Sequence, residues 1–203
     1  MSASESVVAG TFGPGSWPAA RVVLAACTAD IIEIAALRGR ARELADVAAG
    51  RGLTLPACGR VTLAPAGLVL CVRPERWLLL GTATAAGTAV ALWQEACGAA
   101  GTAVELSSGL AVLHLTGPAV HEVLSRGCRL DLDPSGFPAG AAAASVMAQV
   151  AVILARLPAG MLLLTPASTA RHVREWLATA ATACGLAVAA DVTVAALCGD
   201  EAP

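Results

Sequence analysis

The sequence predicts an α+β fold built from two similar halves of antiparallel strands with flanking helices. The first observation is a repeated ending: each half closes with a long helix that carries a tryptophan, Trp93 or Trp176, and stops at a Cys-Gly pair. The second is the strand before each helix, which reads WLLL from Trp77 and MLLL from Met161. The third is the order strand, helix, several strands, helix, which favours antiparallel sheets with helices on one face.

The first half is predicted to span about residues 21–101. Apolar periodicity and turn residues locate its elements, and LAPAG, from Leu63 to Gly67, reads as a hairpin turn. We expect strands at 21–26, 59–63, 68–72 and 77–80, and helices at 38–51 and 84–98.

The second half is predicted to span about residues 102–199. LPAGM, at 157–161, reads as a hairpin turn equivalent to LAPAG. We expect strands at 110–116, 144–148, 150–156 and 161–165, and helices at 118–126 and 168–185. The two halves would form one compact unit, 21–199, behind an irregular arm, 1–20, whose Trp17 suits an anchor on a partner.

The passage from strand to helix in the second half is the most informative segment. The apolar strand 110–116 suits burial on both faces. Thr116 is expected to cap the next helix or to lie just before the cap, Gly117 to allow the turn, and Pro118 to occupy the first helical position. Gly127 is expected to end the helix as its C-cap.

Composition excludes several classes of function. The net charge is −2, so the chain has no excess of basic residues for binding nucleic acid. All thirteen basic residues are arginine. The mean hydropathy is high, +0.72, but the apolar runs 139–155 and 183–198 are short for a membrane span of about 20 residues. We therefore expect no membrane association and no secretory signal. The apolar surface is instead expected to pack against partner subunits.

The cysteines predict neither a zinc site nor a disulfide framework. Their number is odd and no two have C-x-x-C spacing, so we expect reduced, mostly buried thiols in a cytoplasmic protein. The seven are Cys27, Cys58, Cys71, Cys97, Cys128, Cys184 and Cys198.

The three histidines give no metal-ligand pattern. His114 is expected on a strand, and His121 and His172 on separate helices, with no carboxylate or cysteine at ligand spacing. His172, Arg171 and Arg174 form a small basic face that suits either solvent or an acidic partner.

Other reactive side chains also favour structural roles. Asp131 and Asp133 could act as an acid and base pair or bind a cation, but DLDP before a loop is typical of a turn. Ser107-Ser108 lacks the context of a nucleophile, and Cys128, near two arginines, suits a packing position. We therefore expect no catalytic, cofactor-binding or metal-binding residue on this chain.

The stretch SSGLAVLHLTGPAVHEVLSRGCRLDLDPSGFPAG, with RPERWLLL upstream, resembles the gamma subunits of heterotetrameric sarcosine oxidases. The resemblance covers roughly residues 35–190. It implies the fold of the folate-binding domain of aminomethyltransferases. His121 and Ser135 fall within the matched stretch, and the resemblance assigns them no role.

The resemblance implies a non-catalytic, cytoplasmic assembly subunit. Its partners would be an alpha subunit, the main contact, with beta and delta subunits. Their complex would oxidatively demethylate sarcosine to glycine, passing the one-carbon unit to tetrahydrofolate and electrons to oxygen. FAD, FMN, NAD, zinc and tetrahydrofolate would all be held by those partners.

Three alternatives remain open at this point. The chain could be a free-standing folate or one-carbon-binding protein of the same fold, or the equivalent subunit of a related N-methyl amine oxidase. A small membrane-associated protein is the third alternative.

Overall fold

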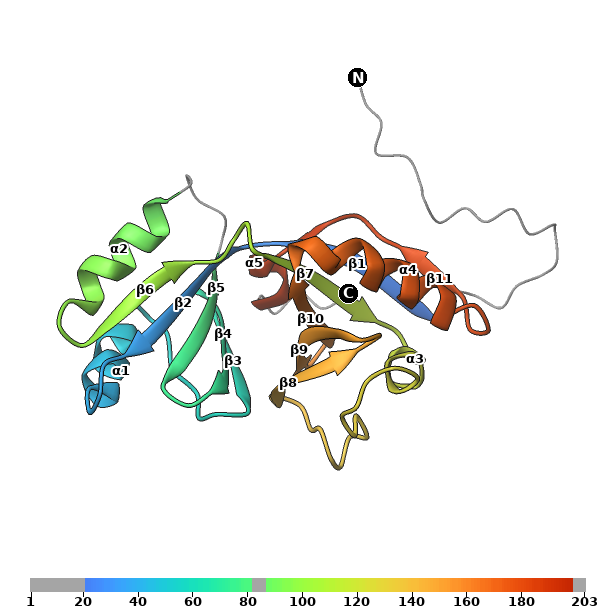
Figure 1. Ribbon diagram of the computed structural model, residues 1–203, viewed down its shortest axis with the longest axis horizontal. Helices are drawn as coiled ribbons and strands as arrows, with labels where there is room; N and C mark the ends of the chain where they lie inside the picture. The colour runs from blue at the N-terminus through green and yellow to red at the C-terminus, as the bar shows by residue number, and fades with distance from the viewer. Residues whose placement is uncertain (1–20, 82–86, 199–203) are drawn as a thin grey trace, which may run out of the picture.

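The computed structural model describes residues 21–81 and 87–198, which form four layers. Two mainly antiparallel sheets pack face to face, and each is covered on its outer face by two helices (Figure 1). The helices are α1 (Ala41–Ala49), α2 (Thr88–Cys97), α3 (Val120–Ser125), α4 (Ala170–Ala180) and α5 (Val194–Cys198), with a short 3₁₀ turn, η1 (Ala167–Thr169). The predicted α+β class is confirmed.

The two sheets have the same strand order apart from one insertion. The five-stranded sheet runs β3-β4-β5-β2-β6 and the larger sheet β8-β9-β10-β7-β1-β11, with β12 also paired to β1. The strands of the first half are β1 (Val22–Thr28), β2 (Asp30–Ala36), β3 (Arg60–Ala64), β4 (Gly67–Arg73), β5 (Arg76–Gly81) and β6 (Gly101–Glu105). Those of the second half are β7 (Leu110–Thr116), β8 (Ala142–Met147), β9 (Val150–Leu157), β10 (Gly160–Pro166), β11 (Leu186–Val188) and β12 (Val192–Thr193).

The inserted strand is β1, which corrects the repeat as read from the sequence. The counterpart of β7 is β2, a strand that the sequence reading missed, and not the predicted strand at 21–26. β1 crosses to the other sheet, where it pairs antiparallel with β7 and parallel with β11. Only Ala29 separates β1 from β2, so one nearly continuous ribbon runs across both sheets (Figure 1).

The predicted equivalence of the two hairpin turns is also wrong. Both LAPAG and LPAGM do form two-residue turns, with Gly67 and Gly160 at positive φ. However, LAPAG joins β3 to β4, whereas LPAGM joins β9 to β10. The topological counterpart of LPAGM is therefore the β4–β5 turn, at residues 73–76.

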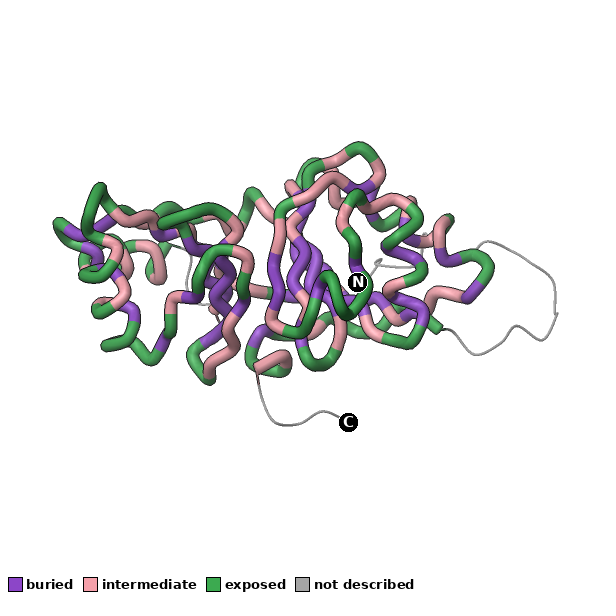
Figure 2. The backbone as a smooth tube through the Cα atoms, turned by 90° about the horizontal axis from the view of Figure 1, so that it is seen from below, coloured by how far each residue is buried: buried purple, intermediate pink, exposed green. Residues whose placement is uncertain are grey.

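Three apolar clusters separate the four layers. Alternation along each strand divides its side chains between them, as on β5, where Leu78 and Leu80 face the other sheet while Trp77 and Leu79 face α1 and α2. The central cluster takes residues from both sheets, so neither sheet is buried without the other. Figure 2 shows the buried positions concentrated along the strands inside the molecule.

The two sheets are also joined through the backbone at one edge. Val61 N–H donates to Gly140 O at 2.9 Å, and Ala142 N–H donates to Gly59 O at 2.8 Å. These bonds occupy outward-facing groups of β3 and β8, which would otherwise be open edges. The connection fixes the loop before β8 against the five-stranded sheet.

The helices are shorter than the sequence predicted. The helix expected at 38–51 is α1, at Ala41–Ala49, and that expected at 168–185 is η1 followed by α4. The start expected for α2 falls at residues outside the described range, as do the arm 1–20 and Trp17.

Candidate functional site

The segment from β6 to the loop after α3 holds most of the residues that the sequence suggested for chemistry. It begins by crossing from one sheet to the other, and Ser107 secures the crossing. Its Oγ accepts a hydrogen bond of 3.0 Å from Ile31 N–H at the start of β2. Gly109 N–H donates to Leu106 O at 2.9 Å, which places Ser107-Ser108-Gly109 in a turn.

The turn into α3 depends on Gly117, as expected, but Thr116 is neither the N-cap nor the residue just before it. Gly117 has a φ of +109°, and a Cβ there would lie 2.4 Å from Arg21 O, just before β1. The helix begins two residues later than predicted, with Ala119 as N-cap and no side-chain cap. Thr116 is the last residue of β7 instead, because the close approach of the turn to Arg21 fixes where the helix can begin.

Gly127 follows α3 but is not the predicted C-cap, a position that Arg126 takes. Its role is packing: a Cβ would lie 2.3 Å from Cζ2 of Trp176 on α4. The absence of a side chain therefore lets the indole ring lie against the backbone. Cys128 next to it is partly buried against the same core, with its Sγ 3.7 Å from Ser145 Oγ.

Asp131 and Asp133 organise the loop after α3 by local hydrogen bonds. Asp131 Oδ1 accepts from Asp133 N–H at 3.0 Å, and Asp133 Oδ1 accepts from Ser135 N–H at 2.9 Å and from Ser135 Oγ at 2.6 Å. The bonds from Ser135 are the main cause that lowers the pKa of Asp133, with smaller contributions from His121 and Arg156. These contacts agree with the turn predicted from DLDP.

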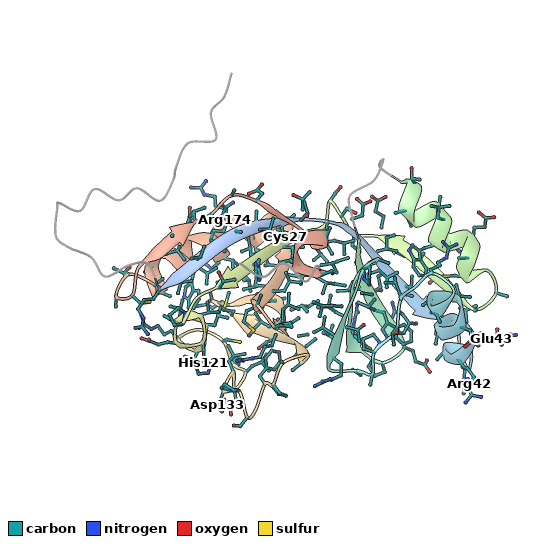
Figure 3. The ribbon with its side chains drawn as sticks, turned by 180° about the vertical axis from the view of Figure 1, so that it is seen from behind. Cys27, Arg42, Glu43, His121, Asp133 and Arg174 are labelled. Carbon is teal, nitrogen blue, oxygen red and sulfur yellow. The ribbon has the colours of Figure 1, made fainter. Side chains whose placement is uncertain are left out.

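The histidines lie apart from one another. His114 is buried on β7, its Nε2 has no hydrogen-bond partner among the described residues, and burial lowers its pKa. His172 is exposed on α4, with Nε2 3.0 Å from Ala148 O. His121 lies on α3 on the same side of the molecule as Asp133 (Figure 3).

The predicted basic face on α4 is partly neutralised. Arg171 Nε lies 2.8 Å from Glu175 Oε1 one turn further along the helix. All three side chains are exposed, and among the described residues Arg174 and His172 form no ion pair.

One polar residue that the sequence reading missed is Arg156, which lines a cavity of about 420 Å³. The cavity is bounded by the β7–α3 turn, the loop after Asp133 and the β9–β10 hairpin, and His121 also contributes to its wall. The signal in the sequence was a single arginine within the apolar strand VAVILARL.

The described residues offer neither a cluster of metal ligands nor a membrane-spanning helix. Within residues 21–81 and 87–198, no three His, Cys, Asp or Glu side chains gather as metal ligands would. Over the same residues, every helix is too short or too polar to cross a membrane.

Sequence comparisons identify a family. The model of the "Sarcosine oxidase, gamma subunit family" matches residues 38–183. Sarcosine oxidase subunit gamma of Arthrobacter sp is 33% identical over 144 residues, which cover 70% of each protein. The protein of the same description from Corynebacterium sp. (strain P-1) is 33% identical over 113 residues, or 54% of each.

Structural comparisons agree with the sequence comparisons. A chain of heterotetrameric sarcosine oxidase from Corynebacterium sp. U-96, solved in complex with pyrrole 2-carboxylate, matches with a TM-score of 0.71 and 29% identity. The match covers 82% of this chain and 87% of that one. Glycine cleavage system aminomethyltransferase T from Bartonella henselae matches with a TM-score of 0.61 over 88% of this chain and 49% of that one. Its 18% identity shows a shared fold alone.

Proposed function

The chain belongs to the sarcosine oxidase gamma subunit family, and from this premise we propose that it serves assembly, stabilising an oxidase whose chemistry is carried out by other subunits. It is the gamma subunit of a sarcosine oxidase complex. The observation that carries the proposal is the match over 87% of a chain in a heterotetrameric enzyme.

The contacts of the polar side chains support a structural task. Ser107 joins the two sheets, the two aspartates form loop turns, and Gly127 admits Trp176. Catalysis needs polar groups that converge on one point, whereas Ser107 bonds the backbone of β2 and the two aspartates bond residues of their own loop.

The proposed partners are alpha, beta and delta subunits, with alpha as the main contact. Supporting features are the high mean hydropathy, +0.72, and four large apolar side chains that are about half exposed. These are Leu37, Leu92, Val104 and Val188. Contact with a neighbouring subunit would remove such side chains from water.

In the proposed reaction the complex oxidatively demethylates sarcosine to glycine. Tetrahydrofolate accepts the one-carbon unit and oxygen the electrons, and the partner subunits hold FAD, FMN, NAD, zinc and tetrahydrofolate. We propose the cytoplasm as the compartment, which the seven unpaired cysteines support because such thiols persist under reducing conditions.

Co-expression of a tagged full chain with the three other subunits tests the assembly function. We expect a heterotetramer that carries flavin absorbance and consumes oxygen with sarcosine, and we expect the tagged chain to carry no flavin after denaturing separation. A chain that elutes free while the other three subunits assemble with full activity would refute the proposal. A panel of N-methyl amines, compared by kcat/KM, tests sarcosine as the preferred substrate.

A further inference from the structure

Arg156 differs from every other cation of this chain. All thirteen basic residues are arginines within the described ranges, and Arg156 alone among them is not exposed. Five other arginines form ion pairs, whereas no carboxylate of the described residues lies within 4.0 Å of Arg156. A charge that is partly withdrawn from water without a direct ion pair is costly to fold.

The hydrogen bonds of Arg156 leave most of its donors free. Its Nη2 donates to Leu132 O at 2.6 Å, which fixes the guanidinium. Its Nε is buried and has no acceptor among the described residues. A guanidinium has five N–H donors, so this side chain is positioned but not satisfied.

The cavity beside Arg156 combines this cation with apolar walls. Pro118, Pro134 and Pro158 form part of its rim, and Val120 and Met161 are buried side chains that contribute to its lining. Proline restricts the backbone, so much of the rim is fixed before any ligand arrives.

Two glycines fix the remaining walls of the cavity. A Cβ on Gly117 would lie 2.4 Å from Arg21 O, and one on Gly160 would lie 2.3 Å from Leu115 O. Each of these two turns therefore lies close against the backbone of a neighbouring segment, which restricts its movement. A preformed cavity loses little conformational entropy when it binds.

The charged groups around the cavity do not neutralise Arg156 directly. Asp133 interacts with Arg156 at a distance, since Arg156 contributes to lowering the pKa of Asp133, but the two form no ion pair and Asp133 Oδ1 accepts its hydrogen bonds from Ser135. Glu122 on α3 is paired with Arg126 at 2.7 Å. His121 in the cavity wall adds a ring nitrogen that can donate a second hydrogen bond.

We propose that this cavity binds a carboxylate group carried on an apolar body, with the guanidinium of Arg156 as counter-ion and His121 as a second donor. Arginine and carboxylate match in geometry and form charge-assisted hydrogen bonds, while the prolines and Met161 contact the apolar part. The carboxylate belongs either to a small organic acid or to an acidic side chain of a neighbouring subunit. The inference goes beyond the assembly function and does not depend on it.

The test is a crystal structure of the purified complex soaked with 4-bromobenzoate, whose bromine is located by anomalous scattering. We expect bromine in the cavity with the carboxylate against Arg156, and no bromine there after soaking with uncharged 4-bromobenzyl alcohol. An acidic side chain of a neighbouring subunit bonded to Arg156 would identify the other source of the same group. A cavity with neither carboxylate, or one that binds both bromine probes equally, would overturn the proposal.

Matched variants distinguish the loss of the Arg156 charge from an effect on folding. Arg156→Met is expected to weaken 4-bromobenzoate binding at this cavity about tenfold or more, whereas Arg174→Met, at an exposed arginine on α4, should leave it unchanged. If Arg156→Met does not fold, the two soaks of the unaltered protein still decide whether the cavity binds a carboxylate. If the chain does not join a complex, the assembly proposal fails, and the same soaks are made with crystals of the full chain.

Discussion

The five-stranded sheet and the larger sheet follow one plan, but only the larger one contains a strand from the other half of the chain. β1 lies between β7 and β11, where the first half pairs β2 directly with β6. The two halves therefore have similar topologies, but only the second half depends on a strand from the other half. The first half completes its own sheet, while the second half is incomplete without residues 22–28.

The two tryptophans also differ, in how tightly their neighbours constrain them. Trp176 lies against the backbone at Gly127, where a single Cβ would collide with it. Trp93, at the corresponding place on α2, lies under Arg51, whose Cζ is 5.2 Å from the ring centroid. The flexible side chain of Arg51 can shift when its neighbour changes, whereas the contact of Gly127 with Trp176 leaves no room for a change.

The largest expected effect is at the turn that borders β1. Gly117→Ala should destabilise the protein by about 3 kcal/mol or more, because positive φ and collision with Arg21 O act together. Gly39→Ala is the matched control after β2: it has φ +77° but open space, so we expect about 1 kcal/mol. Urea unfolding measures both, and equal losses would contradict the unequal dependence of the two halves.

The next effect compares the two tryptophan contacts. Gly127→Ala should cost about 2 kcal/mol from overpacking, while Arg51→Ala should cost at most about 1 kcal/mol, as for an exposed cation–π pair. Combining Gly127→Ala with Trp176→Leu should recover part of the loss in a double-mutant cycle. Additive losses would show that Gly127 and Trp176 do not interact.

A smaller effect is acid sensitivity, which we expect to arise in the second half because the buried His114 lies there. Burial lowers the pKa of His114 from an ordinary value of about 6.5. The unfolded chain then binds more protons, so stability is present above about pH 6.5 and is lost as pH falls toward the folded pKa. His114→Gln should flatten the decline of the urea midpoint between about pH 7 and pH 5, and His172→Gln should not. An unchanged slope in His114→Gln would contradict this.

The smallest effect concerns thiol reactivity and leaves stability unchanged. Burial raises the pKa of Cys27 and of Cys71 to about 11, whereas Cys58 is exposed. Because the thiolate is the reactive form, iodoacetamide at about pH 8 should label Cys58 of the native full chain well before the other two. Peptide mass spectrometry measures the order, and equal labelling would indicate that the chain opens.

The sequence was informative where local pattern and tertiary structure agree. Strand 110–116 was predicted with its observed bounds, since its apolar run is buried between partners on both sides. The sarcosine oxidase resemblance was also confirmed, because it rested on motifs spread along the chain.

The errors arose where distant residues decide the structure. β2 was missed because only Ala29 separates it from β1, and pairing partners far along the chain assign the two strands to different sheets. Arg156 could not be recognised as half-buried from an apolar strand alone. With Trp77 aligned to Met161, its position in the first half is Val72, so the repeat gave no precedent for a charge there.

The position of β1 also sets an order of events during synthesis. Among the strands of the described residues β1 is made first, whereas its neighbours β7 and β11 follow only at residues 110–116 and 186–188. Contacts between residues so distant in sequence slow folding. Until its neighbours have been made, an unpaired apolar strand can pair with another chain. The seven-stranded sheet also needs β12, which ends at Thr193, so β1 needs protection from wrong partners until that strand has been made.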